Sequence, residues 1–186
     1  MPEVSFSPQN HALCHWWQHD GQHFRGPTSP HSAGAVLSNI CLLIAKARQA
    51  QVPVFFARHT GLNDSPLSEQ SPLTQLIPEM DVNVERDIVF IKKHPSCFRD
   101  TGMQLQLIQR GVKRVVIAGM KTEFCVDTTC KVASELGFKT VLISDAQTTV
   151  DNVFLSENEI IAHHNVTLAG PFVSLATADN LRFAPD

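Results

Sequence analysis

Residues 115–129 read VVIAGMKTEFCVDTT, and this stretch decides the fold. An apolar, β-branched run ends at Gly119, a short polar turn follows, and Cys125 then opens a helical pattern. A strand, a turn and a helix in this order place one thiol at the carboxyl end of a strand and the amino end of a helix. The unpaired N–H groups and the helix dipole there favour a thiolate over a thiol. Cys125 is therefore a candidate nucleophile, the alternative being a buried cysteine that only packs.

Strand-like and helix-like patterns alternate along the rest of the chain. The periodicity predicts strands at 12–17, 52–57, 87–92, 113–118 and 139–144, helices at 32–51, 101–110, 124–136 and 156–165, and a short strand or helical turns within 166–181. Such alternation implies parallel strands joined by right-handed crossovers, with helices on both faces of the sheet. We therefore predict an α/β fold, a three-layer α/β/α sandwich with a mostly parallel central sheet.

Length, charge and cysteine content narrow the class of protein. A chain of 186 residues with 43% hydrophobic content can bury one substantial core, so we expect a single domain over residues 1–186. A net charge of −3 without a basic cluster gives no electrostatic case for nucleic acid, and the apolar runs are too short to span a bilayer. The start of the chain lacks the pattern of a secretory signal. Five cysteines without a CxxC pair favour a reducing compartment. We expect a cytoplasmic protein with a small-molecule substrate, and neither a nucleic-acid nor a membrane partner.

Two polar segments interrupt the alternation of elements. Residues 59–86 contain several prolines and serines and follow a strand, where α/β proteins form their sites. A loop of this length is usually functional or mobile, so we expect it to shape the pocket; the alternative is a disordered surface insertion. Residues 20–31 follow the first predicted strand and are therefore expected at the same edge of the sheet.

A second group of reactive side chains ends the strand predicted at 87–92. Residues 91–98 read IKKHPSCF. A lysine at the carboxyl end of one strand, close to the thiol of a neighbouring strand, can hold that thiol as an anion. Taken alone, the pair Lys92 and Lys93 is more typical of solvated surface charge.

The segment around Cys125 resembles the nucleophile motif of the isochorismatase-like cysteine hydrolases, Gly-Val-x-Thr-(Asp/Glu)-x-Cys-Val. The family carries Lys-x-x-x-Ser-x-Phe at the preceding strand, and this spacing selects Lys92 rather than Lys93, with Ser96 and Phe98 in register. Further similarities cover residues 52–175 and include Thr101, Ser144-Asp145-Ala146 and the run IIAHHN at 160–165, which looks like the streptothricin-hydrolase-like branch.

This resemblance implies an isochorismatase-like, Rossmann-like fold and a hydrolase that cleaves a C–N bond of a small amide. In such a reaction Cys125 forms a thioester and Lys92 stabilises the thiolate. The resemblance also implies an oxyanion hole built from the backbone amides of Lys121 and Cys125, with a non-proline cis peptide at Met120–Lys121. It implies no cofactor, and it favours a homo-oligomer, a dimer or a tetramer. Isochorismate hydrolysis is disfavoured, because the true isochorismatases keep the catalytic aspartate and lack the cysteine.

The chain departs from the family at the first strand. The family has an acid/base aspartate there, in an Asp-x-Gln context, whereas residues 12–20 read ALCHWWQHD. Anchoring the comparison on Gln18 and Asp20 puts Trp16 at the position of the aspartate, and a shift by one residue puts Trp17 there. An indole N–H can only donate a hydrogen bond, so neither tryptophan can take the proton of a thiol.

Two interpretations of this departure stay open. Asp20 could reach inward from its loop, or His15 or His19 could serve as a base, because histidine titrates near neutral pH. Alternatively, the chain is a catalytically impaired relative that binds a small molecule or a partner with the same pocket.

The sequence favours no metal site, although histidines recur every four residues near the N-terminus, at His11, His15, His19 and His23. On a helix they would share one face and could hold a metal, but on the expected strand and loop the spacing has no such consequence. The metal-dependent nicotinamidases carry Asp-x-His after the second strand, and residues 57–61 read ARHTG instead. Arg58 or His59 could contact substrate, or could belong to a solvated loop.

Overall fold

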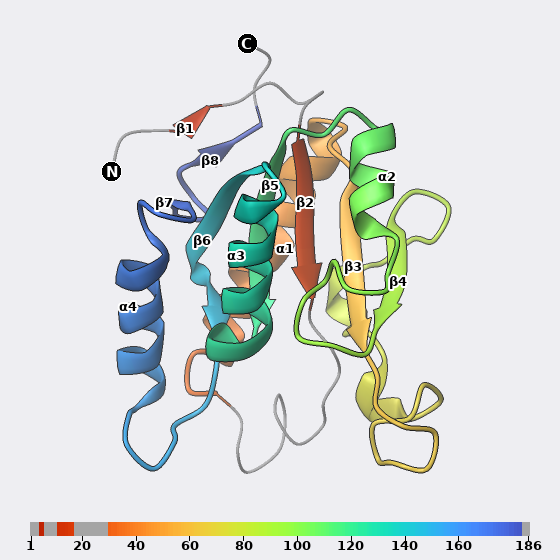
Figure 1. Ribbon diagram of the computed structural model, residues 1–186, viewed down its shortest axis with the longest axis vertical. Coiled ribbons are helices and arrows are strands. Elements are labelled where there is room, and N and C mark those ends of the chain that lie inside the picture. The colour runs from red at the N-terminus through yellow and green to blue at the C-terminus, as the bar shows by residue number, and fades with distance from the viewer. Residues whose placement is uncertain (1–3, 6–10, 17–29, 184–186) are drawn as a thin grey trace.

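A six-stranded parallel sheet forms the centre of the protein, in the strand order β4-β3-β2-β5-β6-β7 (Figure 1). The computed structural model describes residues 4–5, 11–16 and 30–183. The strands are β2 (His11–Trp16), β3 (Val54–His59), β4 (Ile88–Lys92), β5 (Arg114–Met120), β6 (Lys139–Thr148) and β7 (Ser174–Ala176). Outside this sheet, β1 (Val4–Ser5) pairs in parallel with β8 (Leu181–Arg182). The predicted parallel α/β architecture is confirmed.

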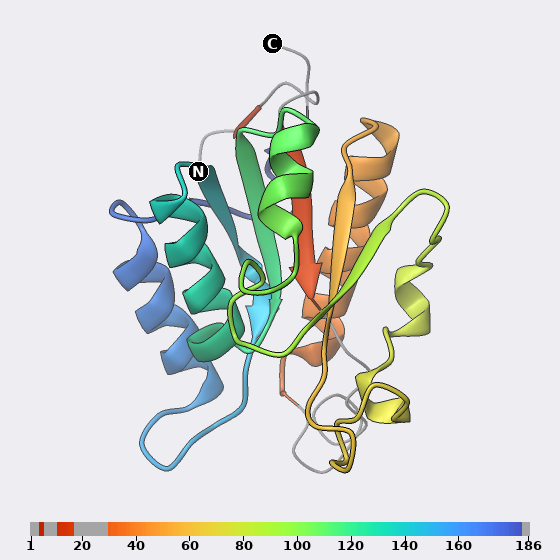
Figure 2. The ribbon, with the colours of Figure 1, turned by 45° about the vertical axis from the view of Figure 1, so that its right-hand side comes forward.

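Helices cover both faces of the sheet, which completes the three layers (Figures 1 and 2). They are α1 (Ala33–Gln49), α2 (Met103–Gln109), α3 (Asp127–Glu135) and α4 (Glu157–Leu168). Helix α1 lies on one face, and the other three contribute buried side chains to the core of the opposite face. None of the helices in the described part of the chain is long and apolar enough to cross a membrane.

The alternation of side chains along β5 explains how one strand serves two cores. Val116 and Ala118 pack into the core shared with α1, whereas Val115 and Ile117 pack into the core on the α2 and α3 face. Successive side chains of a strand point to opposite faces, so a strand buried on both sides is apolar throughout. This is the reason why the run before Gly119 carries no polar residue between 115 and 118.

Local sequence signals explain where several helices begin and end. Gly111 follows α2 with a φ of 68°, and Gly137 follows α3 with a φ of 87°, in the left-handed region that glycine adopts without strain. A capping box opens α4, in which Ser156 and Glu159 each bind the other's backbone N–H. Strand β6 extends beyond the predicted 139–144 to Thr148, because a shift in register lets its last residues pair again with β5.

The segment 59–86 is folded into turns rather than forming an unstructured insertion. It contains two 3₁₀ helices, η2 (Pro72–Thr74) and η3 (Pro78–Met80), and it buries Ile77 and Met80 in the α1 core. Arg58, at the end of β3, donates hydrogen bonds to the carbonyls of Thr74 at 3.0 Å and Glu69 at 2.8 Å. The arginine thus holds the loop against the sheet.

Candidate active site

The carboxyl ends of the parallel strands bring the predicted reactive groups to one edge of the sheet. His59, the last residue of β3, pairs with Lys92, the last residue of β4, and Trp16 of β2 pairs with Gly119 of β5. All four strands point their arrowheads to this edge, where the 59–86 loop also begins (Figures 1 and 2). Binding sites of open α/β sheets form at this edge.

Cys125 and Lys92 meet at the edge. The Nζ atom of Lys92 donates a hydrogen bond to the Sγ atom of Cys125 at 3.0 Å. Cys125 lies in a single π-helical turn, η4 (Thr122–Val126), which joins the end of β5 to α3. Lys92 is buried, with 1% of its surface exposed, whereas the neighbouring Lys93 is exposed. The structure therefore brings together the lysine and the thiol that the sequence selected.

The ammonium group of Lys92 has three more acceptors around it besides the thiol. They are Nδ1 of His59 at 3.1 Å and the carbonyl oxygens of His94 at 3.0 Å and Pro95 at 3.1 Å. A buried ammonium is stable only when its hydrogens are bound, and these groups bind them. Within the described part of the chain, none of its hydrogen-bond partners is a carboxylate. The sulfur atom of Cys125 thus shares the ammonium of Lys92 with an imidazole nitrogen and two carbonyl oxygens.

His59 lies beside Lys92, a contact that the sequence did not reveal. Burial, followed by the positive charge of Lys92 and by His94, lowers the pKa of the His59 imidazole from 6.5 to about 4. The imidazole is therefore neutral near pH 7, and its Nδ1 atom accepts a hydrogen from Lys92. From the sequence, a contact with substrate and a position in a solvated loop were the two alternatives for His59. The contact arises because the last residues of β3 and β4 pair with each other, and a prediction of this pairing would have revealed it.

The other described cysteines lack the environment of Cys125. Burial raises the pKa of the Cys97 thiol to about 12, and it also raises the pKa of Cys130. Both side chains are fully buried in the core on the α3 face. Cys41, Cys97, Cys125 and Cys130 are all free thiols. Of these four, Cys125 alone has a hydrogen bond from a cation, and it stays the candidate nucleophile.

The turn before Cys125 has the backbone geometry that the resemblance implies. The peptide bond between Met120 and Lys121 is cis. The carbonyl of Lys121 accepts hydrogen bonds from the backbone N–H groups of Phe124 and Val126, both at 3.2 Å, which close the π turn. The amides of Lys121 and Cys125 stand at the two ends of this turn, and their part in an oxyanion hole stays a prediction.

The remaining family-like residues shape the backbone around the site. The Thr101 hydroxyl donates to the carbonyl of Cys97 at 2.6 Å and accepts from the backbone N–H of Met103 at the start of α2. Asp145 accepts a hydrogen bond from the backbone N–H of Ala178 at 2.8 Å, and thereby joins β6 to the segment between β7 and β8. The hydrogen bonds of these two residues thus connect and position backbone segments.

The described residues do not identify the acid/base group of the site. Strand β2 ends at Trp16, and the candidates Trp17, His19 and Asp20 lie outside the described residues. His15 lies in β2, on a strand as expected. Over the described ranges 4–5, 11–16 and 30–183, no group of three metal-ligating side chains comes together.

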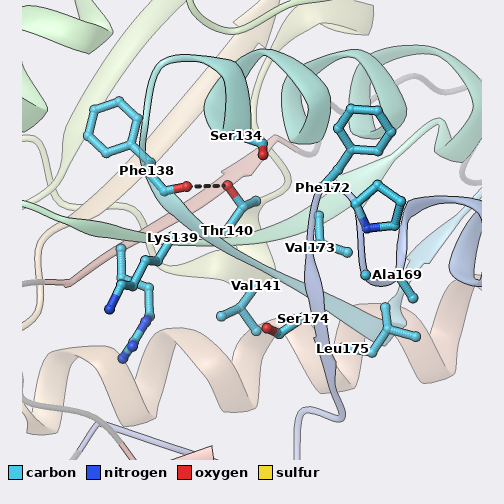
Figure 3. Close-up of a pocket in the computed structure, with 13 residues that line it drawn as sticks. Ser134, Phe138, Lys139, Thr140, Val141, Ala169, Phe172, Val173, Ser174 and Leu175 are labelled. Carbon is cyan, nitrogen blue, oxygen red and sulfur yellow. Dashed lines mark hydrogen bonds between the residues drawn. The ribbon is translucent and has the colours of Figure 1, made fainter.

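The opposite edge of the sheet carries an open pocket, where β5 and β6 begin (Figure 3). Phe138 and Phe172 contribute aromatic rings to its wall, and the hydroxyl of Thr140 donates to the carbonyl of Phe138 at 3.2 Å. Its remaining lining residues are Arg114, Ser134, Lys139, Val141, Ala169, Gly170, Pro171, Val173, Ser174 and Leu175. None of these lining residues is a cysteine, a histidine or a carboxylate, so the lining offers its serine and threonine hydroxyls no histidine or carboxylate as a base.

The fold and the Cys125–Lys92 pair together define a hydrolase-type α/β domain. Residues 13–167 match the family model of the isochorismatase domain, and the chain belongs to the isochorismatase family. It is 30% identical to nicotinamidase 3 of Arabidopsis thaliana over 173 residues, which are 86% of this chain and 82% of that protein. It is 31% identical to streptothricin hydrolase of Streptomyces noursei over 119 residues, 64% of this chain and 43% of that protein. A crystal structure of an isochorismatase family protein superposes with a TM-score of 0.84 at 30% identity, covering 92% of this chain and 100% of that one.

Proposed function

We propose that the protein is a cysteine hydrolase that cleaves the C–N bond of a small amide. The observation that carries the proposal is the hydrogen bond of 3.0 Å from the buried ammonium of Lys92 to the sulfur atom of Cys125. A cation in this position stabilises the thiolate, which is the nucleophilic form of cysteine. Two relatives, named for nicotinamide and for streptothricin, support hydrolysis as the type of reaction.

The proposed reaction has two stages. The thiolate of Cys125 attacks the carbonyl carbon of the amide, and the backbone amides of Lys121 and Cys125 stabilise the oxyanion. Loss of the amine leaves a thioester on Cys125, which water then hydrolyses to a carboxylic acid.

The polar atoms at the carboxyl edge support a small polar substrate. The side-chain oxygens of Thr60, Thr122, Gln147 and Thr149 are buried without a hydrogen-bond partner among the described residues. Each of these residues lies at or just after the end of β3, β5 or β6. Phe124, which precedes Cys125 in the turn after β5, is 55% exposed and offers an apolar surface at this edge.

A binding protein is the second candidate function, and one observation favours it. Either Trp16, which ends β2, or Trp17 takes the place of the family's acid/base aspartate in the sequence, and an indole cannot accept a proton. In that case the same pocket would bind a small molecule or a partner without turning it over.

Ammonia release from a panel of small primary amides, including nicotinamide and benzamide, separates the two functions. The acyl group on Cys125 is trapped by acid quenching and identified by mass spectrometry of that peptide. The hydrolase proposal expects both ammonia and the adduct in the wild type and neither in Cys125→Ala. Amides that bind, as detected by calorimetry, without ammonia or adduct would instead support the binding protein. Asp20→Asn is measured in parallel, because Asp20 is a candidate base.

A further inference from the structure

The surroundings of Lys92 suggest how protons move in this site, because none of its hydrogen-bond partners among the described residues is a carboxylate. Its ammonium contacts the nucleophile at 3.0 Å, and its other partners are an imidazole nitrogen and two carbonyl oxygens. We propose that Lys92 itself gives and takes the proton of the reaction, and that His59 is the positioning residue that holds its ammonium against Cys125. This inference rests on the proposed hydrolase function.

The proton balance closes with Lys92 alone. The thiolate of Cys125 attacks the carbonyl carbon, so that a C–S bond forms and the carbonyl electron pair moves to oxygen. When the C–N bond breaks, its electron pair stays on nitrogen, which takes a proton from the Lys92 ammonium and leaves as the amine. Water then attacks the thioester and gives a proton to the neutral Lys92. The C–S bond breaks, and the thiolate is again paired with an ammonium.

The neutral state of His59 suits this task better than a carboxylate would. A carboxylate partner would form an ion pair with the ammonium, whereas a neutral imidazole holds it by a hydrogen bond alone. The pKa of His59, lowered to about 4 by its burial and then by Lys92 and His94, keeps it neutral near pH 7.

The backbone fixes the distance between the two residues. His59 and Lys92 are partners in the β3–β4 ladder, and the backbone N–H of Thr60 continues that ladder to the Lys92 carbonyl at 2.9 Å. A contact between two neighbouring strand ends has little freedom to vary.

Two substitutions of His59 test its part without any substrate. His59→Leu removes the acceptor, whereas His59→Asn keeps an oxygen atom close to the position of Nδ1. The rate of iodoacetamide alkylation at Cys125 is read by mass spectrometry of its peptide. We expect His59→Leu to slow alkylation roughly tenfold, and His59→Asn to stay within about threefold of the wild type. His163→Leu, an exposed histidine on α4, is the matched control and should alkylate at the wild-type rate.

Lys92→Arg tests the proton transfer, because a guanidinium keeps the positive charge and cannot lose a proton in a protein. p-Nitrophenyl acetate acylates a thiolate without protonation of its leaving group, but hydrolysis of the resulting thioester needs a base. We expect Lys92→Arg to release one burst of p-nitrophenolate and then stall, while the wild type turns over. Amide hydrolysis by Lys92→Arg should fall about 100-fold or more.

Three results would overturn the proposal. His59→Leu alkylating like the wild type, or His59→Asn as slowly as His59→Leu, would remove the positioning part. Steady turnover of the acetyl ester by Lys92→Arg, together with its loss in Asp20→Asn, would assign the proton to Asp20. A wild type that hydrolyses no amide would refute the proposed function, yet the alkylation rates and the burst would still decide the parts of His59 and Lys92.

Discussion

The two edges of the central sheet differ, because one carries a group of reactive side chains and the other carries an open pocket. At the carboxyl edge, Lys92 lies within hydrogen-bonding distance of both Cys125 and His59. At the amino edge, Phe138 and Phe172 line the open pocket of Figure 3, whose lining contains no cysteine, histidine or carboxylate. Strand order in a parallel sheet brings the carboxyl ends and their loops together, so reactive groups from distant segments converge there. A hollow on the surface is therefore a weaker indication of a site than converging side chains.

Removal of the nucleophile should have the largest effect at the carboxyl edge. Cys125→Ala should abolish acyl-enzyme formation and lower amide turnover about 10⁴-fold or more, because the remaining groups cannot form the thioester. Cys41→Ala, on α1 away from the edge, is the control and should keep wild-type turnover. Turnover that survives in Cys125→Ala would disprove covalent catalysis at this thiol.

The next effect concerns the cation beside the thiol. Lys92→Met should slow iodoacetamide alkylation of Cys125 about tenfold or more, since a hydrogen bond to a charged group contributes about 1.5–3 kcal/mol. The rate is measured at pH 7 by mass spectrometry of the Cys125 peptide. The exposed Lys93 is the matched control, and Lys93→Met should alkylate like the wild type. Equal rates in the two variants would mean that Lys92 does not act on the thiol.

A smaller effect is expected from the burial of His59, and it concerns the pH dependence of the folding stability. The pKa of His59 is about 4 in the folded protein and 6.5 without the fold, so the folded state binds fewer protons between these values. Stability from this group is therefore complete above pH 6.5 and is lost as the pH falls toward 4. His59→Asn has no such group, and its urea midpoint should fall less between pH 7 and pH 5 than that of the wild type. Parallel pH profiles of the two proteins would contradict the burial of a neutral imidazole.

The sequence predicted the elements of the carboxyl edge better than the contacts between them. The apolar run before Gly119 and the thiol of Cys125 are local signals, and the Lys-x-x-x-Ser-x-Phe spacing identified Lys92. His59 was not recognised as its partner, because their contact depends on the register between β3 and β4, which residues far apart in the chain determine. The extension of β6 to Thr148 was missed for a similar reason, since its last residues pair only after a shift in register.

The smallest effect is expected from a charge at the amino edge, and it tests whether the two edges act independently. Lys139→Ala should leave amide turnover and Cys125 alkylation within about twofold of the wild type, and stability within about 0.5 kcal/mol, as for most surface substitutions. Strand β5 separates the edges by seven residues, or roughly 20 Å at 3.3 Å per residue. An ammonium at that distance, beyond the Debye length of about 8 Å, is screened from the thiolate. A clear change in turnover with unchanged alkylation would mean that the amino-edge pocket takes part in substrate binding, and the separation of the two edges would then be wrong.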